Sequence, residues 1–181
     1  MVVMSRVSYV RWCCGREFRR LVAVGILVGL AAAFLVLVPS GAAVGAEPVT
    51  PTRHEQTDAH IVKTGNWSDY AKTLASGGSY GRASTTGASA TVYFQGTQLD
   101  WIGMKGTTTG LVDVYLDSTT TKTTTINLTA TKASHQVILW TSPTLANGSH
   151  YLRLVRSSSS GIGKFMTLDA VDIWGTITTG P

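Results

Sequence analysis

Polar and apolar residues alternate, with glycine breaks, through the segment that runs from Gly87 to Asp117. Ala90, Val92 and Phe94 would fall on one side of an extended chain, and the residues between them on the other. A period of two is what a half-buried antiparallel strand requires. The segment therefore predicts three successive β-strands separated by glycine turns, and it contains no helical pattern.

Glycine and asparagine clusters interrupt the rest of the chain at short intervals, between stretches rich in threonine and serine. Threonine suits an exposed strand face. Short strands at such spacing are typical of an all-β sandwich or barrel. The expected strands cover residues 61–63, 79–84, 88–95, 99–104, 111–117, 123–128, 136–141, 151–156 and 165–174.

The first 46 residues differ in composition from the rest. Five arginines and Glu17 precede the uncharged apolar run Leu21–Val38, and small residues then lead to Ala46. This order is typical of a secretory signal, and the apolar run is also long enough to cross a bilayer. We expect either a signal cleaved after Ala46 or an uncleaved N-terminal membrane anchor, with the remaining chain outside the cell in both cases.

This segment also holds most of the net charge. It accounts for +4 of the +5 of the whole chain, so residues 47–181 are almost neutral and offer no basis for a nucleic-acid partner. Both cysteines, Cys13 and Cys14, lie in the same segment, so the exported part would depend on its core and not on disulfides. We expect a flexible leader over residues 47–60, a folded domain over 61–175 and a short tail over 176–181.

Three sequence blocks carry a resemblance to a known family. They are Gly-Ala-Ser-Ala-x-Val-x-Phe-x-Gly-Thr-x-Leu-x-Trp-Ile-Gly-x-Lys-Gly at 87–106, Gly-x-Val-x-Val-Tyr-Leu-Asp at 110–117, and Thr-Leu-Asp-Ala-Val-Asp-Ile at 167–173. Together they resemble the carbohydrate-binding-like jelly-roll modules of bacterial secreted proteins, which have the galactose-binding-like fold. The resemblance covers roughly residues 67–175. It implies an all-β, antiparallel jelly-roll β-sandwich and, for many members, the binding of glycans.

The chain departs from these modules in one respect that concerns metals. Some relatives with this fold hold a structural calcium ion between acids near the two ends of the domain. Asp169 matches the C-terminal acid, but no acidic pair near Ile61 matches the other end. The four histidines show no metal-ligand spacing either. We therefore expect no metal site and no other cofactor.

Aromatic side chains are the candidates for a carbohydrate site, because sugar rings stack on aromatic faces while polar neighbours hold the hydroxyl groups. Trp101 shares the inward side with Leu99, which predicts a core position. Tyr93 and Tyr115 have solvent-side parity and are expected to form a cross-strand pair. The predicted carbohydrate-binding residues are Trp67, Tyr70, Tyr80, Arg82, Lys105, Trp140 and Asn147.

No motif indicates catalysis. The segment Gly77-Gly-Ser79-Tyr-Gly81 matches a nucleophile elbow literally, but no helix pattern follows it, so we interpret it as a turn and keep a small hydrolase only as a third alternative. We expect a secreted, non-catalytic module that binds extracellular or cell-wall carbohydrate. The main alternative is an adhesion or protein-interaction module with a cell-surface protein as partner. Membrane contact is expected only through an uncleaved N-terminal segment.

Overall fold

The computed structural model describes residues 50–181, and the expected signal or anchor over residues 1–46 lies outside them. Within the described part, strands are joined by loops and one short 3-10 turn, and no helix there is long and apolar enough to cross a membrane. The elements are β1 (Thr52–Glu55), β2 (Ile61–Thr64), β3 (Trp67–Ala71), η1 (Ser76–Gly78), β4 (Ser79–Ala83), β5 (Ser89–Lys105), β6 (Leu111–Leu116), β7 (Thr124–Asn127), β8 (Ser134–Thr141), β9 (Gly148–Arg156), β10 (Met166–Leu168) and β11 (Ala170–Thr178).

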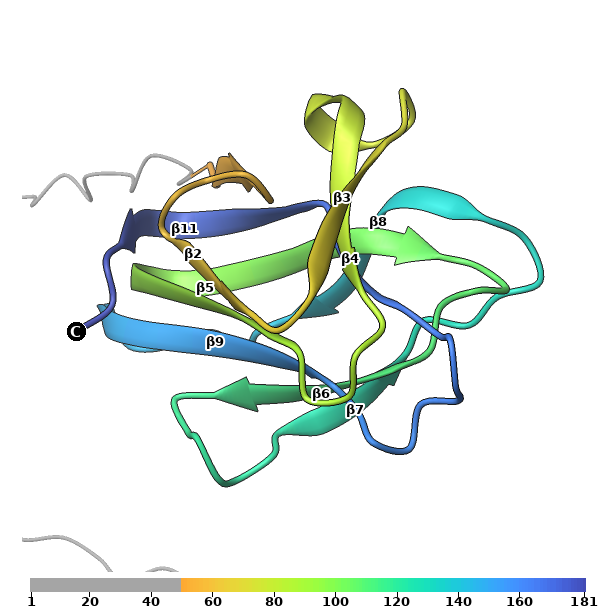
Figure 1. Ribbon diagram of the computed structural model, residues 1–181. Coiled ribbons are helices and arrows are strands. Elements are labelled where there is room, and N and C mark those ends of the chain that lie inside the picture. The colour runs from red at the N-terminus through yellow and green to blue at the C-terminus, as the bar shows by residue number, and fades with distance from the viewer. Residues whose placement is uncertain (1–49) are drawn as a thin grey trace, which may run out of the picture. The chain divides into compact units, whose positions relative to one another are not determined.

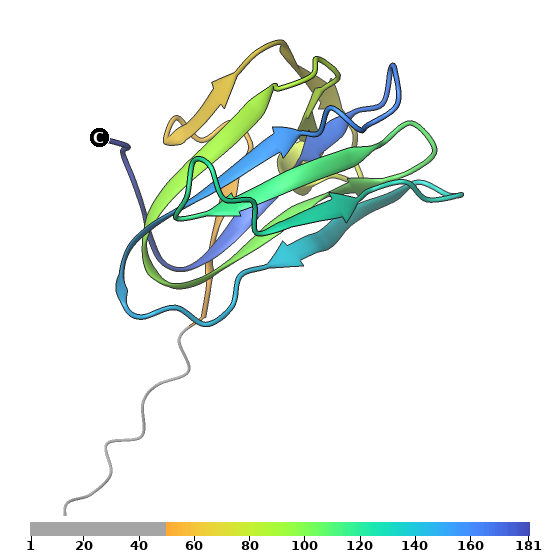
Figure 2. The same ribbon diagram turned by 90° about the horizontal axis from the view of Figure 1, so that it is seen from below.

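These strands form two antiparallel sheets. The larger has eight strands in the order β1-β11-β5-β9-β6-β7, and β2 and β8 also pair with β5. The smaller has the order β10-β4-β3, and its β3–β4 hairpin projects beyond the large sheet (yellow-green in Figure 1). Figures 1 and 2 both show β9 between β5 and β6, an arrangement that decides which side chains meet on that face.

The long strand β5 pairs with four strands of the large sheet. Its first part pairs with β2 and β9, β11 pairs along its middle from Tyr93 to Ile102, and β8 pairs with its last residues. The ladder between β5 and β11 has a bulge where Gly96 faces Gly175. A Cβ atom on either glycine would overlap a backbone carbonyl oxygen of the opposite strand, so this close approach requires glycine.

The core consists of the inward-facing residues of the alternating segments. Val92, Phe94 and Leu152 have no exposed surface, in agreement with the predicted period of two. Trp101 is also fully buried, and its indole Nε1 donates a hydrogen bond to the carbonyl oxygen of Thr167 at 3.1 Å. The antiparallel jelly-roll β-sandwich predicted from the sequence is confirmed.

Several elements differ from the sequence prediction. Residues 88–95 and 99–104 belong to one continuous strand, because the chain keeps its ladder with β11 through the bulge where a glycine turn was expected. The segment 165–174 divides at Asp169 into β10, which pairs with β4, and β11, which pairs with β5.

The folded domain also extends beyond its predicted boundaries, residues 61 and 175, at both ends. Thr52–Glu55, within the expected leader, forms β1 and pairs with β11 over four residues. Trp67–Ala71, expected as a loop, forms β3. Strand β11 continues to Thr178, so the first residues of the expected tail are part of the sheet.

Candidate functional site

The strands β5, β9 and β6 present aromatic and polar side chains on the face that points away from the core. Register places Thr91, Arg153 and Tyr115 in one row across the three strands. Tyr93 and Tyr151 lie opposite each other in the next row. Residues paired in register point to the same side of a sheet, so these five side chains share the outer face while their chain neighbours form the core.

The tyrosines of this face are close neighbours. The ring centroids of Tyr93 and Tyr151 are 5.6 Å apart, and the ring planes are inclined by 38°. The guanidinium carbon of Arg153 lies 5.8 Å from the ring centroid of Tyr115. All four side chains are half-buried, so the sheet holds them in place while part of each remains accessible.

An open depression of about 490 Å³ lies over this face, and we call it the tyrosine depression. Its volume is in the range of small-molecule sites. Three hydroxyl-bearing side chains, one imidazole and one guanidinium surround the two tyrosine rings. The lining residues are Thr91, Tyr93, Thr119, Ser149, His150, Tyr151, Arg153 and Pro181.

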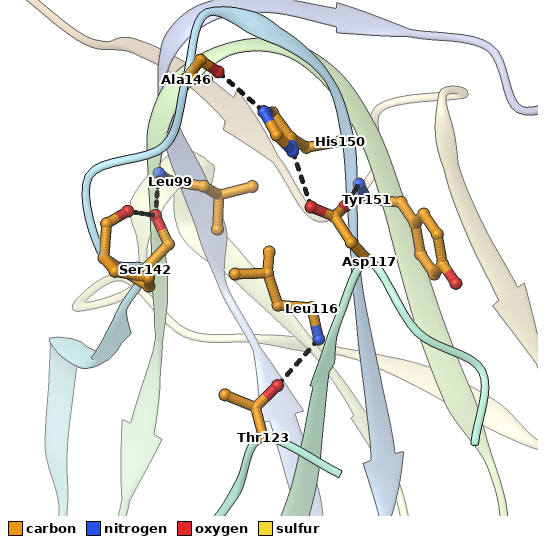
Figure 3. Close-up of polar contacts among 9 residues, drawn as sticks. Leu99, Leu116, Asp117, Thr123, Ser142, Ala146, His150 and Tyr151 are labelled. Atoms are coloured by element: carbon orange, nitrogen blue, oxygen red, sulfur yellow. Dashed lines mark hydrogen bonds and ion pairs between the residues drawn. The ribbon is translucent and has the colours of Figure 1, made fainter. Parts of the chain in front are cut away.

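Asp117, after the end of β6, contacts His150 and Tyr151 of β9 (Figure 3). Its Oδ1 accepts the backbone N–H of Tyr151 at 2.8 Å, and its Oδ2 lies 2.7 Å from Nδ1 of His150. Asp117 has a φ of 51°, a left-handed conformation that aspartate adopts more readily than most residues. The side chain therefore fixes the backbone of Tyr151 at the point where β6 ends.

The imidazole of His150 lies between two acceptors. Nε2 is 2.9 Å from the carbonyl oxygen of Ala146, and Nδ1 faces Asp117. Only the imidazolium form can donate from both nitrogens. The Ala146 carbonyl and then the Asp117 carboxylate accordingly raise the pKa of His150, against the opposing effect of burial.

Trp67 and Trp140, predicted as carbohydrate-binding residues, are half-buried and lie against the core. Trp67 packs against the core, and its Nε1 donates to the carbonyl oxygens of Thr64 and Ser89 at 3.1 Å each. Trp140 also packs against the core and lies in register with the buried Trp101. Both indoles are half-buried, as are Tyr93, Tyr115 and Tyr151, and neither tryptophan lines the tyrosine depression.

Three other predicted residues come together on the small sheet. Tyr70 is 43% exposed and its ring centroid lies 5.5 Å from that of Tyr80, which is buried. The guanidinium carbon of Arg82 lies 4.3 Å from the Tyr70 ring centroid. Burial raises the pKa of Tyr80, an effect that the Arg82 charge partly offsets. This group lies on a different sheet from the tyrosine depression.

The last two predicted residues are placed apart from each other. Lys105 ends β5, is half-buried and pairs with Ser134, outside both groups. Asn147 is exposed in the loop before β9, directly after Ala146, which contacts His150 of the depression.

Sequence reasoning missed the main contributors to the depression. Tyr151, Arg153 and Asp117 were not among the predicted site residues. The expected pairing of Tyr93 with Tyr115 is wrong, because β9 lies between their strands and places Tyr151 beside Tyr93. The alternation of polar and apolar residues in β9 places Tyr151 and Arg153 on the outer side. Which side chains they meet there depends on the order of the strands.

Two acids near the ends of the domain, Glu55 and Asp169, lie close enough for the charge of one to act on the other. Glu55 Oε2 and Asp169 Oδ1 are both buried without a hydrogen-bond partner. Burial raises the pKa of Asp169, and the nearby Glu55 charge adds to the effect. Carboxylate oxygens are common calcium ligands, so this pair supplies part of what a calcium site requires.

A calcium ion takes six to eight oxygen ligands, whereas this corner already holds the positive charge of a guanidinium. Arg53 donates to both carboxylate oxygens of Asp172 at 2.7 and 2.8 Å, and its charge also lowers the pKa of Asp169. Between residues 50 and 181, no three His, Cys, Asp or Glu side chains converge as metal ligands would. The cation beside these acids is therefore the guanidinium of Arg53.

Comparison with known proteins gives partial matches. No protein-family model matches the chain. The A type blood alpha-D-galactosamine galactosaminidase of Flavonifractor plautii is 30% identical over 108 residues, which are 60% of this chain and 10% of the enzyme. The chain thus spans about a tenth of the length of this curated relative.

Two solved structures contain a similar domain. The family two carbohydrate esterase from Cellvibrio japonicus superimposes with a TM-score of 0.52 and 21% identity, over 73% of this chain and 36% of the esterase. A Paenibacillus xanthan lyase gives a TM-score of 0.50 with 16% identity, over 72% of this chain and 13% of the lyase. The fold shared with one part of these larger proteins is the β-sandwich that the sequence predicted.

Proposed function

We propose that this protein is a non-catalytic module that binds carbohydrate in the tyrosine depression. The observation that carries the proposal is the pairing of Tyr93 with Tyr151 beside Arg153 in an open depression edged by hydroxyl groups. An amphipathic ligand with one apolar face and a polar rim matches this surface.

A sugar ring is such a ligand. Its C–H face would pack on the half-buried tyrosine rings, which the sheet already holds in position, so little side-chain freedom is lost on binding. Its hydroxyl groups would receive hydrogen bonds from Arg153 and exchange them with Thr91, Thr119 and Ser149. Asp117 would act indirectly, by fixing the backbone of Tyr151.

The comparisons support this role in outline. The galactosaminidase and the esterase act on carbohydrates by their names, and the part of each that matches this chain is a small fraction of its length. Ser79, the residue of the hydrolase alternative, begins a strand and accepts a hydrogen bond from Gln56 at 2.8 Å. These observations favour binding over hydrolysis. The basic and apolar N-terminal segment supports placement of the module outside the cell.

The test is a binding screen on a glycan array and on insoluble cell-wall polysaccharides. Residues 45–181, which form one compact unit with its own core, would be compared with the Tyr151→Ala and Tyr70→Ala variants. We expect saturable binding that weakens at least about tenfold in Tyr151→Ala and is unchanged in Tyr70→Ala on neutral glycans. If no glycan is bound, the proposal fails and the protein-interaction alternative takes its place.

A further inference from the structure

Arg82 is held between two aromatic rings on the small sheet. Its guanidinium carbon lies 4.3 Å from the ring centroid of Tyr70 and 4.7 Å from that of Phe165. Arg82 is on the central strand β4, Tyr70 is on β3, and Phe165 directly precedes β10, so the rings come from the two strands that flank β4. Stacked aromatic rings restrict a guanidinium plane and leave its N–H donors pointing outward along its edge.

The charge of Arg82 has no carboxylate partner among residues 50–181. Arg153 also has no acid partner there and contacts the Tyr115 ring, whereas the other two arginines of this part are paired or hydrogen-bonded. Arg53 pairs with Asp172, and the buried Arg156 donates to four carbonyl oxygens and a threonine hydroxyl. No acid lies within ion-pair distance of Arg82 in the described residues, and its polar neighbour there is the Tyr80 hydroxyl.

The neighbouring strand β3 carries one exposed acid, and register places it on the opposite side of the small sheet from Arg82. Lys72 is close enough to lower the pKa of His135, after the larger effect of burial, and the His135 ring lies 5.9 Å from that of Tyr80. The nearest acid in sequence, Asp69, alternates with Tyr70 on β3 and contacts Lys63 at 3.7 Å. The face that carries Arg82 is therefore suited to an anion.

We propose that Arg82, held by Tyr70 and Phe165, binds the anionic group of an acidic saccharide at a second site, separate from the tyrosine depression. The planar guanidinium matches a carboxylate or a sulfate ester, since either presents two oxygens to its N–H fork. The exposed Tyr70 ring adds a surface on which the same sugar packs. The inference rests on the proposed function only in that the ligand is a saccharide.

The test compares three polymers: polygalacturonate as the carboxylate probe, dextran sulfate as the sulfate probe, and a neutral glycan found in the array screen. Binding of residues 45–181 would be measured by affinity electrophoresis and calorimetry at about 0.15 M salt, where weak surface attraction is screened. The variants are Arg82→Gln, Arg82→Lys and Tyr151→Ala, each checked by thermal unfolding. Arg82→Lys keeps the charge, so it separates stacked, two-pronged recognition from simple attraction.

We expect Arg82→Gln to lose at least about tenfold in affinity for an acidic polymer, Arg82→Lys to lose most of the same affinity, and neither to alter neutral-glycan binding. Preference for one acidic polymer identifies the anion.

Acidic-polymer binding that survives Arg82→Gln, or wild-type binding of neutral glycans alone, overturns the second site and leaves the proposed function intact. Loss of neutral but not acidic binding in Tyr151→Ala supports two separate sites.

Discussion

His150 and Asp117 are joined by a 2.7 Å contact between Nδ1 and Oδ2, while the other imidazole nitrogen faces the Ala146 carbonyl (Figure 3). The histidine side chain is largely covered, and the aspartate side chain is 41% exposed. This contact links the end of β6 to the strand that carries Tyr151. It couples the protonation of one residue to the stability of the edge of the tyrosine depression.

The raised pKa of His150 predicts a pH-dependent stability. Because the folded protein binds the proton more tightly than the unfolded chain, the contribution is full below the unfolded pKa of about 6.5 and is lost as pH rises through the folded pKa. We expect His150→Gln to destabilise the protein by roughly 1 kcal/mol at low pH and by less at high pH, since the partly exposed pair is screened by solvent. Urea unfolding at about pH 5.5 and 8.5 measures this difference. Parallel pH profiles for wild type and variant would contradict it.

The contribution of Asp169 to stability should change with pH in the opposite direction from that of an acid whose folded pKa is lowered. Burial raises its folded pKa, so the folded state holds the proton and stability falls as pH rises from the unfolded pKa of about 3.9 through the folded value. The Asp169→Asn variant cannot ionise. Its stability relative to wild type should therefore be more favourable at pH 7 than near pH 3.5. A relative stability that is the same at both pH values would show that Asp169 titrates normally.

The contacts of Arg53 predict that the stability of the protein does not depend on calcium. The guanidinium supplies the positive charge beside Asp172, Glu55 and Asp169, so this corner does not need a metal ion to balance its acids. We expect the melting temperature to be unchanged by excess calcium or by EDTA. Arg53→Gln should lower stability by about 1 kcal/mol, because the ion pair is partly exposed. A rise in melting temperature with calcium that EDTA reverses would contradict this prediction.

Gly96 and Gly148 provide a matched pair of substitutions. The two residues pair directly across β5 and β9, yet a Cβ atom on Gly96 would overlap the Trp174 carbonyl, whereas one on Gly148 would meet its nearest neighbour at 3.8 Å. Gly96→Ala should destabilise the protein by about 2–4 kcal/mol, and Gly148→Ala should be neutral or slightly stabilising. Chemical denaturation measures both. Equal effects of the two substitutions would show that the bulge between β5 and β11 relaxes without cost.

The folded body could be predicted from local patterns where one side of a strand is buried. The alternation around Val92 and Leu152 identified their strands and their inward sides, and both residues are fully buried. The same reasoning failed at residues 96–98, because glycine marks a bulge as well as a turn and the hydrogen bonds to β11 decide between them. It also missed β1 and β3, whose short polar sequences form strands only because β11 and β4 provide their partners.

The sequence by itself determined that the chain is an antiparallel β-sandwich and which residues of its longest strands point inward, because a period of two follows from local backbone geometry. Only the tertiary structure decided which outward side chains become neighbours. Tyr93 meets Tyr151 because β9 lies between β5 and β6, and Arg82 lies between Tyr70 and Phe165 because β4 lies between β3 and β10. Strand order depends on contacts between residues that are distant in sequence, which form when both layers are buried together. No local pattern encodes this order.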